Sequence, residues 1–120
     1  MSIQTKTMVS KERRKGPERR TDLRVGIDAD VEWVLDGVRR PGHVSDMSMT
    51  GCFILTAGEF SDGEIVLICF PHADGGRVEI RGEIRNNVPE IGFAVRFLSP
   101  TPFQQEFIRD FAEFHYVHRE

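Results

Sequence analysis

The sequence is poor in cysteine and contains no long apolar run. The 120 residues include two cysteines, Cys52 and Cys69, and each lies within a short apolar stretch. Because they form no C-x-x-C pair, we interpret them as buried, reduced thiols rather than as a disulfide or a metal site. No segment approaches the roughly 18–20 apolar residues of a membrane span, and the N-terminus has no apolar segment of signal-peptide type. The sequence therefore predicts a cytoplasmic protein.

The residue patterns of common catalytic sites are also absent. The sequence contains no H-E-x-x-H, no P-loop motif and no G-x-S-x-G. His115 and His118 are one helical turn apart, but no cysteine is close to them in sequence, so we interpret them as surface residues. Most acidic residues alternate with apolar ones, which is typical of the solvated face of a strand. We expect neither an enzyme, nor a metal site, nor a cofactor.

Lysine is absent from most of the chain, and charge is unevenly distributed along it. Residues 1–24 carry a net charge of +5, whereas residues 25–120 carry −8. Basic arms often contact phosphates, but an acidic body argues against a large nucleic-acid interface. We expect a flexible basic arm at residues 1–16, one folded domain at residues 17–116 and a short tail at residues 117–120.

Short runs of alternating apolar and polar residues dominate the rest of the chain. Asp36-Gly37 is a hairpin signal, because type I′ turns need the positive φ that Gly adopts without strain. Residues 45–51 are small and polar, which predicts a loop. The expected strands lie at about residues 25–35, 38–44, 52–56, 64–70, 77–86 and 91–98. Six short strands followed by one helix predict a mainly β protein, a small antiparallel β-barrel that is closed or half-closed.

The C-terminal segment has the signals of a helix. Thr101 is a suitable N-cap, Pro102 suits the first helical position, and Gln104 completes a capping box. Apolar residues recur at three and four positions and form one stripe: Phe103, Phe107, Ile108, Phe111 and Phe114. We expect this stripe to pack on the mouth of the barrel, with a partner protein as the less favoured alternative.

Three arginines stand just before the first predicted strand. They are Arg19, Arg20 and Arg24, the last two being four positions apart. A guanidinium can bind two phosphate oxygens, or O6 and N7 of guanine, and it can stack on a purine. The alternative for this segment is a solvated basic tail.

The polar segment at residues 45–51 carries a second candidate group. Asp46 can accept hydrogen bonds from N1–H and N2–H₂ of guanine, which adenine cannot offer. Ser48 can donate its hydroxyl to a phosphate or base, and Gly51 lets the backbone turn and approach a ligand closely. Alone, this D-x-S-x-x-G composition is common in turns.

Together the two segments resemble the PilZ domain family of cyclic diguanylate receptors. The family pattern is R-x-x-x-R followed by [DN]-x-S-x-x-G, and here it is Arg20-Thr-Asp-Leu-Arg24 and Asp46-Met-Ser48-Met-Thr-Gly51. The segment from Gly92 to Phe97 resembles the closing strand of the family. The resemblance covers residues 17–116 and implies a PilZ-type barrel with a C-terminal helix.

The resemblance also implies a ligand and a mechanism. Cyclic di-GMP would bridge the arginine segment and the Asp46 segment, so that the arm wraps over the barrel and changes a surface for a protein partner. A histidine kinase, a methyltransferase or a motility or secretion component is the kind of partner expected, with motility, biofilm or virulence as the output. The family often places a Trp or Arg beside a guanine at the position of Arg85.

Arg19 adds a cation beside the motif, which favours a stacked pair of ligands, because four phosphates need more positive charge than two. Two alternatives to this receptor function stay open. The chain could be a PilZ-fold adaptor that does not need the nucleotide, or a nucleic-acid-binding barrel, although Trp33 and most Phe residues fall at core or helix positions rather than on exposed strand faces.

Overall fold

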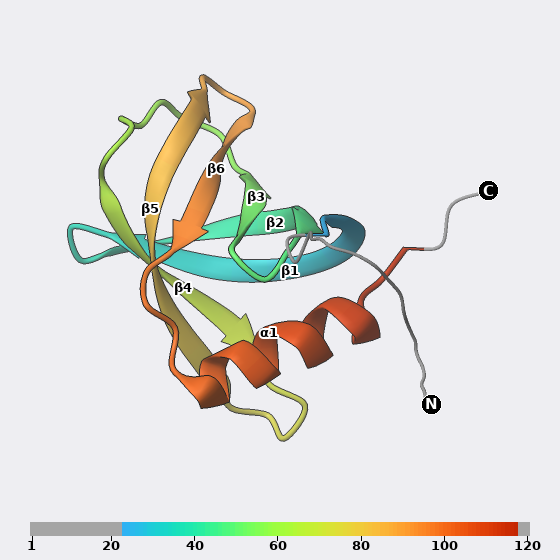
Figure 1. The fold of residues 1–120 in the computed structure, drawn as a ribbon. Coiled ribbons are helices and arrows are strands. Elements are labelled where there is room, and N and C mark those ends of the chain that lie inside the picture. The colour runs from blue at the N-terminus through green and yellow to red at the C-terminus, as the bar shows by residue number, and fades with distance from the viewer. Residues whose placement is uncertain (1–22, 118–120) are drawn as a thin grey trace, which may run out of the picture.

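A computed structural model describes residues 23–117 of the chain (Figure 1). The arm expected at residues 1–16 lies outside this range, as do Arg19, Arg20 and most of the expected tail, so the division of the chain drawn from the sequence stays a prediction. The described elements, in chain order, are β1 (Val25–Leu35), β2 (Val38–Met47), β3 (Gly51–Leu55), β4 (Ile65–Pro71), β5 (Arg77–Val88), β6 (Gly92–Phe97) and α1 (Pro102–Phe114).

The six strands form a closed antiparallel barrel, which confirms the predicted architecture. Their order around the barrel is β1-β2-β3-β6-β5-β4, and the pairing of β4 with β1, in which Trp33 faces Ile68, closes the circle. Alternate residues of each strand therefore point into the barrel and out toward solvent. In Figure 1 the long β1–β2 hairpin crosses the middle of the molecule, and α1 lies below it.

The β1–β2 hairpin turns at the dipeptide that the sequence singles out. Asp36 has a φ of 52° and Gly37 a φ of 77°. Positive φ at both central positions is the conformation of a type I′ turn, whose twist matches that of the flanking strands. The turn pairs Leu35 with Val38 and so sets the register of the whole hairpin.

The end of β2 corrects the prediction of a loop at residues 45–51. β2 continues to Met47, so Asp46 is a strand residue, and only the turn at residues 48–50 separates β2 from β3. The strand continues because Asp46 and Met47 pair with the start of β1, and irregularities in both neighbouring ladders absorb the change of register. Outward-facing polar side chains gave this strand end the composition of a loop.

The barrel interior is filled by aromatic and aliphatic side chains. Trp33 is fully buried, meets Phe60 and Phe93 edge to face at centroid distances of 5.0 and 4.9 Å, and donates its indole N–H to the carbonyl oxygen of Pro41 at 3.3 Å. The polar group of this large side chain is thereby satisfied inside the core. Cys52 and Cys69 are free and buried, as predicted.

Helix α1 closes one mouth of the barrel. Its start has the predicted capping box: the Thr101 hydroxyl accepts from the Gln104 N–H at 3.1 Å, and the Gln104 side chain accepts from the Thr101 N–H at 2.8 Å. Phe107 and Phe111 pack on Phe70 of β4, with centroids 5.7 and 5.0 Å apart. The helix therefore completes the core that the strands leave open.

The apolar stripe of α1 does not pack on the barrel as a unit, which corrects the prediction for its two ends. Ile108 and Phe111 are buried, whereas Phe103 is 61% and Phe114 is 84% exposed. At about 100° per residue, Phe103 and Phe114 project from the helix only about 20° apart, at one edge of the buried arc centred on Phe111. The helix buries the middle of its stripe and leaves that edge in solvent.

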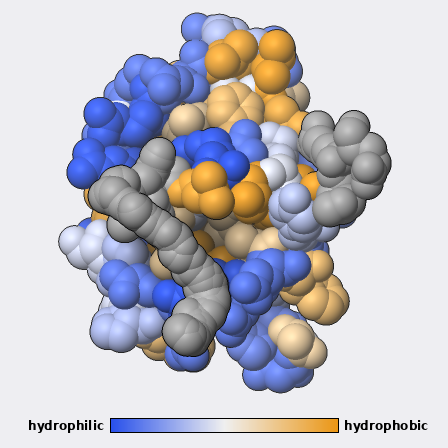
Figure 2. All heavy atoms as spheres, turned by 45° about the vertical axis from the view of Figure 1, so that its right-hand side comes forward, coloured by the Kyte–Doolittle hydropathy of each residue, from blue (hydrophilic) through white to orange (hydrophobic). Residues whose placement is uncertain are grey.

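Several apolar side chains lie on the surface among polar ones. On the face shown in Figure 2, hydrophobic patches alternate with strongly hydrophilic regions. Leu23 and Tyr116 are among the exposed large apolar residues, together with the two ends of the helical stripe. Within residues 23–117, no helix has the length and apolar character that crossing a membrane requires.

The division of the stripe predicts different stabilities for two matched variants. Phe111→Ala removes a buried ring and leaves a cavity, so we expect it to lower the free energy of unfolding by about 3–5 kcal/mol. Phe114→Ala removes an exposed ring of the same helix, and we expect a change within about 0.5 kcal/mol. Urea titration followed by Trp33 fluorescence measures both values. Equal effects of the two substitutions would contradict this division.

Candidate functional site

Arg24 and Asp46, which belong to different sequence motifs, meet in the fold. The antiparallel register aligns Gly26 with Asp46, so the residue just before β1 lies beside the end of β2. The Arg24 guanidinium donates to Oδ1 of Asp46 at 2.6 Å, and the two side chains are 45% and 35% exposed. An ion pair this exposed stabilises a fold by at most about 1 kcal/mol. Its main effect is to hold both side chains in place on the surface.

The turn after β2 is built around the Ser48 hydroxyl. Ser48 is only 4% exposed; its Oγ accepts from the Thr50 N–H at 3.2 Å, and its own N–H donates to the Gly51 carbonyl at 2.8 Å. The Thr50 carbonyl in turn accepts from the Phe97 N–H of β6 at 2.8 Å. In this structure the Ser48 hydroxyl shapes the turn, and a contact with a ligand stays a prediction.

Gly51 is required by the close approach of two strands. A Cβ atom at this position would lie 2.0 Å from the carbonyl oxygen of Val95 on β6, a distance at which the backbone would have to move. Any side chain would therefore separate β3 from β6. The glycine keeps this part of the barrel wall flat and leaves its outer surface open to a ligand.

Three arginines border a hollow of about 400 Å³ on the outside of the barrel. Arg24 comes from the segment before β1, Arg85 from β5 and Arg96 from β6. Arg85 was singled out in the sequence, and it lies at an irregularity of the β5–β6 ladder, between Ile84 and Asn86. No acidic residue lines the hollow, so its chemistry suits an anion with several oxygens.

Arg96 is a candidate binding residue that the sequence motifs do not indicate. It lies directly opposite Gly51 in the β3–β6 ladder and is exposed. The signal in the sequence is the alternation of β6, in which Phe93, Val95 and Phe97 are buried and Arg96 must face outward. What the sequence could not show is that this outer face adjoins Arg24 and Arg85.

Together these residues form a site with a rigid part and a cationic part. The structure brings together Arg24, Asp46, Ser48, Gly51 and Arg85 from the predicted set, whereas Arg19 and Arg20 lie outside the described residues. Among the described residues, no group of three or more His, Cys, Asp or Glu side chains could hold a metal ion. The arrangement can bind phosphate through guanidinium groups and can offer one carboxylate to a hydrogen-bond donor.

Comparison with known proteins identifies the family of the chain. The sequence profile of the PilZ domain matches residues 18–114. The chain belongs to the PilZ domain family. A sequence comparison with curated proteins found no match.

Solved structures of PilZ domains share the fold. The PilZ domain of YcgR from Escherichia coli, solved with c-di-GMP, is 15% identical with a TM-score of 0.65, over 82% of this chain and 92% of that one. The PilZ domain of CeSA from a cellulose-synthesising bacterium is 20% identical with a TM-score of 0.62, over 78% and 99%. The c-di-GMP complex of MrkH from K. pneumonia is 16% identical with a TM-score of 0.61, over 81% and 52%.

The Cys52 thiol is buried in the barrel wall next to Gly51, directly behind the candidate site of this PilZ domain. Complete burial raises the pKa of Cys52 to about 12; the negative charge of Asp46 adds to the increase, and the positive charge of Arg24 opposes it. The thiolate is the reactive form of cysteine. At pH 8 only about one native thiol in ten thousand is ionised, whereas an unfolded cysteine with its ordinary pKa of about 8.5 is substantially ionised.

We therefore predict that Cys52 reacts with an aromatic disulfide reagent only when the barrel opens. In a Cys69→Ala variant at pH 8, labelling should be very slow in buffer and should accelerate along the urea unfolding curve. Absorbance of the released thiolate measures the rate. Rapid labelling without denaturant would contradict the placement of Cys52 inside the wall behind the site.

Proposed function

We propose that this PilZ domain is a receptor that binds cyclic di-GMP on the outer face of the barrel and regulates a partner protein. The proposal rests on one observation: a hollow bordered by Arg24, Arg85 and Arg96, in which Arg24 is also paired with the Asp46 carboxylate. The presence of c-di-GMP in the similar structures of YcgR and MrkH supports this choice of ligand.

The arginines suit the phosphates of the ligand. Each guanidinium presents five donors in a planar fork that matches phosphate oxygens, and it stays charged at any physiological pH. Arg85 and Arg96 approach the hollow from neighbouring strands, whereas Arg24 approaches from the segment before β1. Because the three arginines converge from three segments, they can contact more than one phosphate and leave one guanidinium plane free to stack on a guanine.

Asp46 can select guanine without losing its ion pair. A carboxylate has about four acceptor sites, and Arg24 occupies one oxygen at 2.6 Å. The remaining sites can accept from N1–H and N2–H₂ of a guanine, two donors that adenine lacks on the same edge. Because Asp46 is about one third exposed, a base can reach it from solvent.

Ligand binding would change the conformation of the segment that precedes β1. Arg20 and Arg24 would bind the same nucleotide, and ordering this segment over the barrel would change the surface that a partner contacts. A histidine kinase, a methyltransferase or a motility or secretion component fits such a receptor, with motility, biofilm or virulence as its output, and the cytoplasm is where it would meet them.

The first test removes single arginines and measures affinity by calorimetry. We expect Arg24→Ala to weaken cyclic di-GMP binding by roughly 1.5–3 kcal/mol, about ten- to a hundred-fold, because a charge-assisted contact is lost. Arg20→Ala should behave alike, and Arg96→Ala should weaken binding in the same direction. The matched control is Arg39→Ala, which removes another arginine–carboxylate pair, 2.9 Å from Glu32, away from the hollow. Unchanged affinity in Arg24→Ala, or an equal loss in Arg39→Ala, would refute the site.

The second test concerns stoichiometry. Arg19 adds to the cations of the site, and a stacked pair of ligands carries four phosphates, so we expect the wild-type protein to bind two cyclic di-GMP molecules per chain. Arg19→Ala should reduce this number toward one. The molar ratio at the midpoint of the calorimetric isotherm gives both values. Saturation of the wild type at one ligand per chain would reject the role assigned to Arg19.

A further inference from the structure

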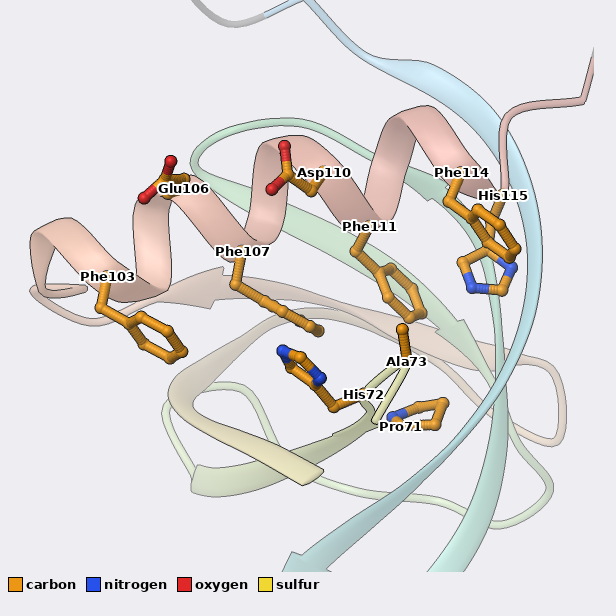
Figure 3. Close-up of a pocket in the computed structure, with 10 residues that line it drawn as sticks. All are labelled: Pro71, His72, Ala73, Phe103, Glu106, Phe107, Asp110, Phe111, Phe114 and His115. Carbon is orange, nitrogen blue, oxygen red and sulfur yellow. The ribbon is translucent and has the colours of Figure 1, made fainter. Parts of the chain in front are cut away.

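A groove lies on the side of the barrel mouth where α1 faces the β4–β5 hairpin (Figure 3). It has a volume of about 610 Å³. Phe103, Phe107 and Phe111 of α1 point into it toward the hairpin residues Pro71, His72 and Ala73, and Phe114 lines its far end beside His115. The two exposed rings stand at its ends, about 16 Å apart at 1.5 Å per helical residue. This groove is separate from the arginine hollow and shares no residue with it.

The charge of the groove is negative and is not compensated within the described chain. Glu106 and Asp110 stand one helical turn apart on the outer edge of the helix, and neither has an ion-pair partner among the described residues. No lysine or arginine lines the groove. Its occupant should therefore combine apolar side chains for the phenylalanine floor with cations for the two carboxylates.

A second copy of the same groove is a poor occupant. Pairing two α1 helices through this edge would bring four carboxylates together, and the acidic body offers no opposing cations at the groove. Like charges placed opposite one another at an interface are unfavourable. The electrostatics thus favour a basic segment.

The chain itself contains a segment with this chemistry, and we infer that its residues 1–16 dock in the α1 groove. These residues carry a net charge of +4, with five cations and one acid. Met8 and Val9 form an apolar pair between Lys6 and Lys11, so the pair suits the phenylalanine floor while the lysines pair with the carboxylates. The described chain, from residue 23 onward, is acidic overall, so charge complementarity favours this intramolecular contact.

The chain between Val9 and Leu23 is long enough for residues 1–16 to reach the α1 groove and short enough to keep them near it. Leu23, the first described residue, borders a hollow together with Ile108, Ala112 and Tyr116, so the chain enters the described fold beside α1. Val9 stands fourteen positions before Leu23, an extended length of roughly 46–50 Å, whereas a helix is only about 10–12 Å wide. A tether of this kind gives an effective concentration on the order of millimolar, so weak affinity suffices.

The inferred contact does not depend on nucleotide binding, so it can be tested without cyclic di-GMP. Cys52 and Cys69 are buried, so a nitroxide attached to Ser10→Cys in the full-length chain reports from one position. We expect it to broaden amide signals of groove residues such as Ala73, Phe103 and Phe114, but not those of the arginine hollow. Uniform broadening over the protein, or none at the groove, would overturn the inference.

Two matched pairs of variants separate charge from apolar packing. Asp110→Lys and Phe114→Ser should each reduce the broadening at the groove by roughly half or more, because one repels the cations and the other removes the apolar floor. Glu59→Lys and Ile91→Ser change an exposed acid and an exposed apolar residue elsewhere and should leave it unchanged. An equal loss of broadening in Asp110→Lys and Glu59→Lys, or in Phe114→Ser and Ile91→Ser, would overturn the assignment to the groove.

Two further measurements decide between occupants. Raising the salt from about 0.05 to 0.5 M should weaken the contact, because it screens the exposed ion pairs. In a mixture, one protein carries the nitroxide without isotope label and the other carries the isotope label without nitroxide. This mixture should show no broadening, because the contact is within one chain. Broadening in the mixture would instead identify a second copy as the occupant, and persistence at high salt would refute the charge pairing.

Discussion

The register of the β1–β2 hairpin is the constraint on which the candidate site depends. A two-residue turn at Asp36-Gly37 starts the pairing, and the ladder continues until Gly26 faces Asp46. Only this register places Arg24, one residue before β1, within 2.6 Å of the Asp46 carboxylate. A shift by one residue would turn Asp46 toward the core and separate the two motifs. A turn about ten residues away thus determines the geometry of the candidate binding face.

The barrel wall supplies the rigid part of that face. Gly51 allows β3 and β6 to lie in backbone contact, and the Ser48 turn is tied by hydrogen bonds to itself and to β6. These two motif residues act first on the protein's own backbone, which explains why a small buried hydroxyl and a glycine are found there. The arginines are the variable part, because they stand outside the wall on three different segments.

Helix α1 separates two tasks along one apolar stripe. Its middle closes the barrel through Ile108 and Phe111, whereas Phe103 and Phe114 remain on the edge that faces the β4–β5 hairpin. The same helix carries two carboxylates beside that edge, those of Glu106 and Asp110, which have no ion-pair partner within residues 23–117. The described surface therefore has two regions of opposite charge: the arginine hollow, whose lining suits an anion, and the helix groove, whose lining suits a cation.

Local patterns in the sequence determined the elements of this protein. Alternation along the strands, the Asp36-Gly37 turn and the Thr101 capping box depend on neighbours only a few residues apart, so the barrel, its helix and the two motifs could be predicted. Three features could not be predicted, because each depends on residues distant in the chain. They are the strand ends, the exposure of Phe103 and Phe114, and the place of Arg96. Asp46 became a strand residue only through β1, and Arg96 joined the site only because β6 lies between β3 and β5. Strand pairing across the barrel, which no local pattern encodes, determines where Asp46 and Arg96 lie.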